Sequence, residues 1–288
     1  MIMTIAQPAV IRFAPSPSGY LHLGHAYSAL FSHAQAQNLN GRFLLRIEDI
    51  DTTRCRKLFE DAIYEDLGWL GLKWEEPVRI QSEHMSDYKE ALRELETNNL
   101  IYPCFCTRKE IQTQIQQSSK APHGPDGFIY PGTCRKLPSD LREEKIKQGQ
   151  AYALRLDMNK AIEITGPLFW QDLSAGEFKA TPEIFGDIVL ARKDIATSYH
   201  LSVTLDDALQ GISCITRGKD LFEATHIHCL LQALLGLPKP VWHHHNLICD
   251  EEGNRLAKRH NALAIRELRE KGHSPEDVLA MVGFNCNT

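Results

Sequence analysis

The sequence lacks any apolar run long enough to cross a lipid bilayer, which argues against a membrane-spanning protein. Its first residues carry neither the charged segment nor the cleavage site that a secretory signal peptide requires. It also lacks internal repeats and long low-complexity tracts, so a solenoid architecture is excluded. We therefore expect a globular, cytoplasmic protein without a membrane partner.

The sequence also has no excess of basic over acidic residues. The chain has 32 Lys and Arg against 37 Asp and Glu residues, so it does not coat nucleic acid over its whole surface. A local basic surface would still allow contact with RNA. With 288 residues, 43% of them hydrophobic, the chain can form one large or two modest domains. Its eight cysteines are expected to be reduced thiols, some of them metal ligands, rather than a disulfide framework.

The most informative stretch that is present runs from Arg12 to His25 and reads RFAPSPSGYLHLGH. A buried strand, a turn rich in proline and glycine, and a helix over 23–38 are predicted here. This arrangement suits a phosphate, because free backbone N–H groups and the helix dipole both favour anions. His22 and His25 stand at the helix start, either as phosphate donors or merely as helix caps. Gly24 leaves the backbone open to the close approach of a nucleotide.

Strands and helices are predicted to alternate before and after a segment of different composition. The predicted strands are 9–13, 42–48, 78–80, 188–190, 199–203, 212–216 and 247–248, and the predicted helices are 23–38, 55–70, 85–95, 221–235 and a last one that begins at Ser274 and Pro275. This rhythm predicts an α/β fold with a Rossmann-like, doubly wound parallel sheet that binds ligands at the carboxyl ends of its strands. The expected parts are 1–100 and 185–246 as the halves of this domain, an insertion over 101–184, and a loop with a short helical tail over 247–288.

The insertion contains three cysteines close together in sequence, Cys104, Cys106 and Cys134. Three thiols in a loop-rich segment with little apolar material predict a structural zinc site, since a metal lets such a weak core fold. His123 is the better fourth ligand on generic chemistry, because a tyrosine phenol is hard to ionise. Three ordinary thiols are the alternative. The run His243–His245 is expected to end a strand near the ligand, because neighbours on a strand point to opposite faces.

Charged residues mark a second set of candidates. Glu48 and Asp51 follow a predicted strand, where an acid suits a substrate ammonium group, although Asp51 fits a helix cap better. Arg12 and Arg217 each end a predicted strand. Two guanidiniums can bind two carboxylates, which suits an acidic amino acid. The late segment 255–259, RLAKR, is by itself only a solvated basic loop.

Taken together, these motifs resemble the glutamyl and glutaminyl branch of the class I aminoacyl-tRNA synthetases. HLGH is similar to the HIGH signature of that family, and RLAKR resembles its KMSKS loop, with Ala257 in place of a serine and Lys258 retained. The resemblance implies a class I synthetase fold and ATP as a substrate, with Mg²⁺ expected. It places His22, Gly24, His25 and Lys258 at the ATP and gives catalytic roles to the two histidines and Lys258, which would neutralise the leaving pyrophosphate.

The resemblance also implies a glutamate pocket and a zinc ligand set. The implied glutamate-binding residues are Arg12, Ser16, Glu48, Tyr199 and Arg217, with Glu48 at the α-amino group. The spacing CxC…YxxxC is similar to that of short glutamyl-synthetase-like proteins, and it favours Tyr130 over His123 as the fourth zinc ligand beside the three cysteines.

Only 29 residues, 260–288, follow Arg259, fewer than the helical anticodon-binding region of a glutamyl-tRNA synthetase needs. We therefore expect a truncated paralogue of this branch, a monomer that activates L-glutamate without tRNA. Such paralogues transfer glutamate to the cyclopentenediol of queuosine, the modified wobble base of tRNA(Asp). Basic residues in 255–271 would support RNA contact. The alternatives are a fragmentary synthetase that charges a terminal ribose, another HIGH-containing nucleotidyltransferase, and a non-catalytic RNA-binding or zinc-binding module.

Overall fold

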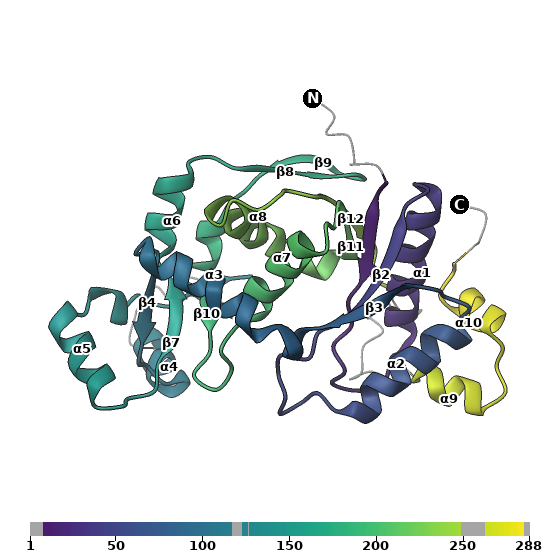
Figure 1. The fold of residues 1–288 in the computed structure, drawn as a ribbon, viewed down its shortest axis with the longest axis horizontal. Helices are drawn as coiled ribbons and strands as arrows, with labels where there is room; N and C mark the ends of the chain where they lie inside the picture. The colour runs from purple at the N-terminus through teal and green to yellow at the C-terminus, as the bar shows by residue number, and fades with distance from the viewer. Residues whose placement is uncertain (1–7, 117–122, 126, 249–262, 285–288) are drawn as a thin grey trace.

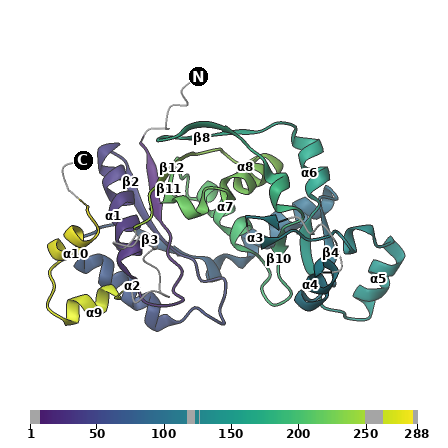
Figure 2. The ribbon, with the colours of Figure 1, turned by 180° about the vertical axis from the view of Figure 1, so that it is seen from behind.

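The computed structural model describes residues 8–116, 123–125, 127–248 and 263–284, which form three parts in a row along the long axis (Figure 1). The N-terminal strands and their helices lie at one end, the strands and helices of the second half lie in the middle, and a small mixed unit lies at the other end. Figure 2 shows the same order from behind, with the C-terminal helices beside the N-terminal ones. Among the described residues, no helix combines the length and the apolar character that crossing a membrane requires.

A parallel sheet forms the N-terminal end. Its elements are β1 (Val10–Phe13), α1 (Leu23–Asn38), β2 (Arg42–Ile47), α2 (Lys57–Trp69) and β3 (Glu75–Ile80), and the strands lie in the order β1-β2-β3. β1 and β2 pair in register from Val10 opposite Arg42. The strands and helices predicted for this part of the chain are confirmed, because apolar residues at strand spacing and at helix spacing alternate clearly there.

The second half of the chain continues this sheet. β11 (Cys214–Gly218) lies beside β1, where the Val10 N–H donates to Ser213 Oγ at 2.9 Å and the Ser213 N–H donates to the Val10 carbonyl at 3.0 Å. β12 (Val241–His245) pairs in parallel with β11, and β8 (Phe169–Asp172) pairs in parallel with β12. β9 (Gly176–Lys179) is antiparallel to β8. The predicted parallel α/β sheet is confirmed.

The small unit at the far end is built on an antiparallel sheet. Its strands are β4 (Ile101–Cys104), β7 (Ala153–Leu156) and β10 (Val189–Ala191), in the order β10-β7-β4. The two sheets do not divide at residue 184. β8 and β9 join the main sheet, where Trp170 packs against Trp242 in the core, whereas β10 pairs with β7 in the small sheet.

Two predicted strands are wrong. Residues 199–203 begin a helix, α7 (Tyr199–Leu209), whose first turn is capped by Ser198 Oγ accepting from the Leu201 N–H. This helix is buried on several sides, from Leu201 through Asp207, so its sequence has no amphipathic stripe that distinguishes it from a buried strand. Residues 247–248 lie beyond the end of β12 and are not a strand.

The remaining helices cover the sheets. They are α3 (Met85–Thr97), α4 (Arg108–Gln116), α5 (Ser139–Lys147), α6 (Met158–Thr165), α8 (Ala224–Leu234), α9 (Ile265–Glu270) and α10 (Pro275–Met281), and a short hairpin joins β5 (His123–Gly124) to β6 (Gly127–Phe128). α9 packs on α2, and α10 packs on α1. Ser274 caps α10 and Pro275 is its first residue, so the predicted start of the last helix is confirmed.

Candidate active site

A cavity of about 460 Å³ opens at the carboxyl ends of β1, β2 and β11, beside the start of α1. Its volume falls within the range of about 300–1,000 Å³ that is usual for small-ligand sites. The structure brings every described residue predicted for ATP or glutamate into the lining of this one cavity: Arg12, Ser16, His22, Gly24, His25, Glu48, Tyr199 and Arg217. These residues come from five separate segments, so the fold gathers what the sequence spreads over 206 positions, 12–217.

The start of α1 forms the end of the cavity that suits a nucleotide. His22 caps the helix, because its Nδ1 accepts from the Gly24 N–H at 3.1 Å, and the His25 Nδ1 accepts from the His22 N–H at 3.2 Å. In each neutral ring the remaining proton is then on Nε2, which makes that nitrogen a donor. Each histidine can therefore accept through Nδ1 at the helix start and donate through Nε2 to a ligand at the same time. β12 adds His245, whose Nε2 lies 2.8 Å from Ser28 Oγ in the same lining.

The other end of the cavity contains a buried ionic network around Asp207 of α7. Arg12 Nε donates to Asp207 Oδ1 at 2.8 Å, and Arg46 Nη1 donates to the same oxygen at 2.8 Å. Arg46, which is completely buried, also donates to Glu48 Oε1 at 3.0 Å. Burial opposes the charge on Asp207, but the two guanidiniums hold its pKa below the ordinary value. Burial raises the pKa of Glu48, and Arg46 is the nearest cation that opposes this.

Arg217 is the other buried guanidinium of the cavity, and its neighbours are neutral. Its Nε donates to His244 Nε2 at 3.1 Å, its Nη1 lies 3.0 Å from His228 Nδ1, and its Nη2 donates to Thr225 Oγ1. Within the part of the chain that the structure describes, it forms no salt bridge to a carboxylate. Burial lowers the pKa of Arg217, although a guanidinium stays protonated in proteins. This charge is therefore available to an anionic ligand.

The histidine on β12 that supports Arg217 is itself held by a carboxylate. His244 Nδ1 lies 2.7 Å from Asp172 Oδ2 at the end of β8, so Nδ1 carries the proton and Nε2 is the acceptor for Arg217. Burial, followed by the charge of Arg217, lowers the pKa of His244 to about 4. Tyr199 lies at the start of α7 on the same side of the cavity, and burial raises the pKa of its phenol. Both groups are neutral near pH 7.

Lys258 and the whole RLAKR segment lie outside the described residues. The described residues on either side both lie at the cavity. Ile248 lines it, and Ala264 forms a β-bridge with His22, next to which the Ile265 N–H donates to the Leu21 carbonyl at 2.9 Å.

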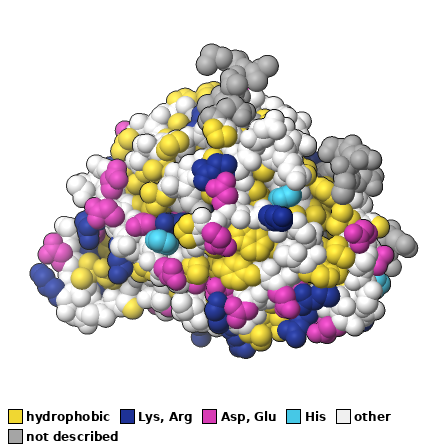
Figure 3. Space-filling model, turned by 45° about the vertical axis from the view of Figure 1, so that its right-hand side comes forward, with side chains coloured by type: hydrophobic (Ala, Val, Ile, Leu, Met, Phe, Trp, Pro, Cys, Tyr) yellow, Lys and Arg dark blue, Asp and Glu magenta, His cyan; other side chains and the backbone are white. Residues whose placement is uncertain are grey.

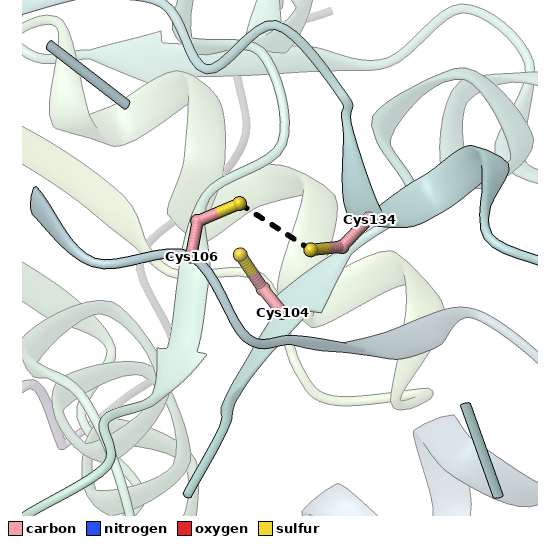
Figure 4. Close-up of side chains that lie close together, drawn as sticks. All are labelled: Cys104, Cys106 and Cys134. Carbon is pink, nitrogen blue, oxygen red and sulfur yellow. Dashed lines mark hydrogen bonds between the residues drawn. The ribbon is translucent and has the colours of Figure 1, made fainter. Parts of the chain in front are cut away.

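The three cysteines of the insertion form a separate cluster far from this cavity (Figure 4). The Sγ atoms of Cys104, Cys106 and Cys134 all lie within 4.8 Å of one another. The Tyr130 hydroxyl lies 3.4 Å from Cys104 Sγ and 3.6 Å from Cys106 Sγ, and it accepts from the Cys134 N–H at 2.8 Å. Three convergent thiols with a fourth oxygen among them fit a tetrahedral zinc ion. For His123 the structure describes only the backbone, in β5.

Several residues that shape the site were not predicted from the sequence. Asp207, Asp172 and Thr225 hold the arginines or their supporting histidine, and the two aspartates act on residues that are distant in sequence. Asp206 and Asp207 offer the one usable signal. Two consecutive acids within an apolar segment are unusual for a buried element, and burying both requires cationic partners.

Comparison with known proteins identifies relatives over almost the whole chain. Residues 8–285 match the family described as the catalytic domain of class I tRNA synthetases (E and Q). The chain is 48% identical to the glutamyl-Q tRNA(Asp) synthetase of Rhodobacter capsulatus, over 96% of this chain and 100% of that protein. It is 39% identical to the protein of the same name from Symbiobacterium thermophilum, over 95% of this chain and 85% of that one.

Longer relatives match over only part of their length. The glutamate–tRNA ligase of Aquifex aeolicus is 38% identical over 95% of this chain and 57% of its own length. Among solved structures, a glutamate tRNA ligase from Elizabethkingia meningosepticum in complex with its amino acid is similar, with a TM-score of 0.74 and 26% identity. That match covers 93% of this chain, which spans about half of the ligase, 54% of its length.

Proposed function

The chain belongs to the glutamyl and glutaminyl branch of the class I tRNA synthetases, and on that premise we propose that it is a ligase that activates L-glutamate with ATP and transfers it to the queuosine base of tRNA(Asp). The observation that carries the choice of amino acid is Arg217, a buried guanidinium without a carboxylate partner among the described residues. A second guanidinium, Arg12, lines the same cavity, but Asp207 already balances its charge. An amino acid with a carboxylate in its side chain supplies the opposite charge that Arg217 lacks.

In the proposed complex the glutamate side-chain carboxylate binds Arg217 beside the Tyr199 hydroxyl. The Glu48 carboxylate binds the α-ammonium group, and Ser16 completes the wall of the cavity between them. Because burial raises the pKa of Glu48, Arg46 is needed to keep this carboxylate ionised and in place. This arrangement directs the α-carboxylate toward the start of α1.

ATP, which brings Mg²⁺ with it, occupies the other end of the cavity. The His22 and His25 Nε2–H groups donate to its phosphates, and Gly24 allows the nucleotide to approach the helix backbone. An oxygen of the glutamate α-carboxylate attacks the α-phosphorus, and pyrophosphate departs with the electron pair of the broken bond. Positioning and charge neutralisation suffice for this step, without a protein nucleophile. The resemblance of the RLAKR segment to the KMSKS loop assigns to Lys258 the neutralisation of the pyrophosphate.

The choice of RNA is supported by the relatives named glutamyl-Q tRNA(Asp) synthetase, one of which matches this chain over its full length. The second candidate is charging of a terminal ribose, which the 38% identity to a glutamate–tRNA ligase supports. A cytoplasmic location and a monomeric state remain part of the proposal.

A structural zinc ion in the insertion is also part of the proposal. Cys104, Cys106 and Cys134 would bind it as thiolates, with the Tyr130 oxygen as the fourth ligand. The apolar cluster around these residues is small, and a bound metal would stabilise it.

Glutamate-dependent exchange between ATP and pyrophosphate, measured without RNA, tests the activation step. We expect exchange with L-glutamate and not with L-glutamine or L-aspartate. Lys258→Ala should lower kcat for exchange by about 100-fold or more, as expected when a charge that stabilises the transition state is lost. Lys57→Ala, on an exposed part of α2, is the control and should leave exchange unchanged. Absence of exchange with every amino acid would overturn the enzyme assignment.

A further inference from the structure

A second cavity of about 350 Å³ adjoins the glutamate end of the first. The two cavities share Ser16, Glu48 and Tyr199 in their linings. No residue of α1, β11 or β12 lines the second cavity, so it meets the first at the glutamate end and not at the nucleotide end. A group in the second cavity would therefore approach the activated glutamate from its amino-acid end, away from the nucleotide.

The lining of the second cavity combines apolar walls with charged groups. Ile50, Val189 and Ile195 supply apolar surface. Asp51 accepts from Thr53 Oγ1 at 2.6 Å and lies 3.4 Å from Arg192, and this hydrogen bond and this cation hold its pKa below the ordinary value. Such a lining suits a small ring with hydroxyl groups, because the ring faces contact the apolar walls while an ionised carboxylate accepts from the hydroxyls.

Arg192 also lines a third cavity, of about 300 Å³, which extends away from the site. Lys89 of α3 and the Tyr152 ring line this third cavity with it. The Tyr152 ring packs edge-on against Phe105, with 5.7 Å between centroids, and 36% of the residue remains exposed. Of the basic residues in this lining, Arg93 pairs with Glu90 and Arg192 pairs with Asp194, whereas Lys89 forms no ion pair with the described residues. On the face shown in Figure 3, basic and acidic side chains are interspersed.

We propose that the second and third cavities together form the track of the acceptor RNA strand, with the glutamate-accepting ring in the second cavity and the neighbouring nucleotide in the third. This inference rests on the proposed function. An acceptor group on an internal base must leave the base stack to react, while its backbone stays outside. Arg192, which pairs with Asp51 and Asp194, lies where the two cavities meet, and because its side chain is 37% exposed it can still donate to that backbone. Tyr152 then stacks on the next base, and Lys89 binds a phosphate.

In this arrangement the reaction is a simple acyl transfer. A hydroxyl oxygen of the ring attacks the glutamyl carbonyl carbon of the adenylate from the second cavity. The addition gives a tetrahedral intermediate, whose collapse leaves the new ester bond, breaks the bond between the carbonyl carbon and the phosphate oxygen, and releases AMP with the electron pair. The hydroxyl proton passes to solvent, and the step needs no oxidant.

Tyr152→Ala and Lys89→Ala test the track, with Tyr152→Phe and Lys57→Ala as matched controls. We expect Tyr152→Ala to raise KM for queuosine-containing tRNA(Asp) by about 10-fold through lost stacking, whereas Tyr152→Phe keeps the wild-type value. Lys89→Ala should reduce the salt dependence of RNA binding by about one phosphate contact. Glutamate-dependent pyrophosphate exchange should be unchanged in all four variants.

Direct binding of the same tRNA, measured by filter retention, tests the RNA track separately from the proposed acceptor. Wild-type RNA affinity and KM in both alanine variants would overturn the track, whatever the rate of transfer. A parallel loss of pyrophosphate exchange would also overturn it, because these residues would then act on activation. Failure of the wild-type protein to glutamylate tRNA(Asp), with a loss of binding still caused by Tyr152→Ala, would refute the proposed acceptor and keep the RNA track.

Discussion

At the scale of single residues, the site depends on buried arginines, some of which pair with a carboxylate while another has only uncharged neighbours. Arg12 and Arg46 share a carboxylate, whereas the described partners of Arg217 are two histidines and a threonine. A buried charge without an opposite charge is costly, so a protein retains one where a ligand supplies the missing charge. We therefore propose that recognition of glutamate depends most on Arg217.

Replacement of Arg217 should weaken the binding of glutamate and leave the binding of ATP unchanged. We expect Arg217→Met to raise KM for glutamate in pyrophosphate exchange by about 100-fold or more, because a fully desolvated ion pair is lost, while KM for ATP changes little. Arg135→Met, which removes a guanidinium that pairs with Asp187 in the small unit, is the matched control. Equal increases in both KM values for Arg217→Met would contradict this role.

The residues that line the site could be predicted from the sequence, but the residues that hold them in place could not. His22, Glu48 and Arg217 stand at predicted strand ends or helix starts, where ligands bind in such sheets. Asp172 and Thr225 act only through His244 and Arg217, so neither has a local signal in the sequence. Contacts of this kind depend on the pairing of distant strands, which a single sequence does not specify.

At the scale of elements, α7 is the helix that organises the glutamate end. It carries Tyr199 at its start, and Asp206 and Asp207 two turns later. Asp207 holds Arg12 and Arg46, whereas Asp206 accepts from Arg79, Gln81 and Tyr88 and lies farther from the cavity lining. The strand predicted for residues 199–203 ends before Asp206 and Asp207, so it would not have placed them in one element with Tyr199. Because α7 is almost completely buried, its sequence lacks the amphipathic pattern from which a helix is predicted.

The two adjacent acids of α7 allow a matched comparison. Asp207→Asn and Asp206→Asn each leave buried guanidiniums partly unpaired, so both should lower the free energy of unfolding, by about 3 kcal/mol or more. Only Asp207→Asn should also raise KM for glutamate, by about 10-fold, since it alone releases Arg12. Denaturant unfolding and pyrophosphate exchange measure the two effects. Equal KM values in the two variants would refute the positioning role of Asp207.

The lowered pKa of His244 on β12 predicts how the free energy of unfolding depends on pH. In the unfolded chain His244 titrates near 6.5, but burial and Arg217 lower its pKa to about 4 in the folded protein. Between these values only the unfolded state binds the proton, so the free energy of unfolding falls as the pH falls, by about 3 kcal/mol across this range. His244→Gln should flatten the slope of the free energy of unfolding against pH. An unchanged slope in His244→Gln would contradict the assigned burial of this histidine.

At the scale of the whole molecule, two sheets of different kinds are joined by a chain that crosses between them four times. The parallel sheet was predictable, because strands and crossover helices alternate in its sequence. The division between the sheets was not predictable, since β8 and β9 are short strands whose place depends on packing of Trp170 against Trp242. The small unit has a limited apolar cluster around Tyr102, Phe105 and Tyr130, so its stability should depend on the metal that we propose.

Metal removal should therefore act on the small unit first. We expect one zinc ion per chain by elemental analysis, and a chelator should lower the thermal midpoint of the protein as the metal leaves. Cys104→Ser should lose the zinc, whereas Cys55→Ser, outside the cluster, should retain it. Loss of zinc in His123→Ala together with its retention in Tyr130→Phe would overturn the choice of Tyr130 as the fourth ligand.

In the proposed function, glutamate is activated in the first cavity and passes to one particular RNA acceptor. Radiolabelled glutamate and ATP, incubated with the purified protein and with tRNA(Asp) that contains or lacks queuosine, test this directly. We expect label only on the queuosine-containing tRNA, recovered in the anticodon fragment after nuclease cleavage. Equal labelling of both tRNAs, or label recovered at the 3′ end, would contradict it.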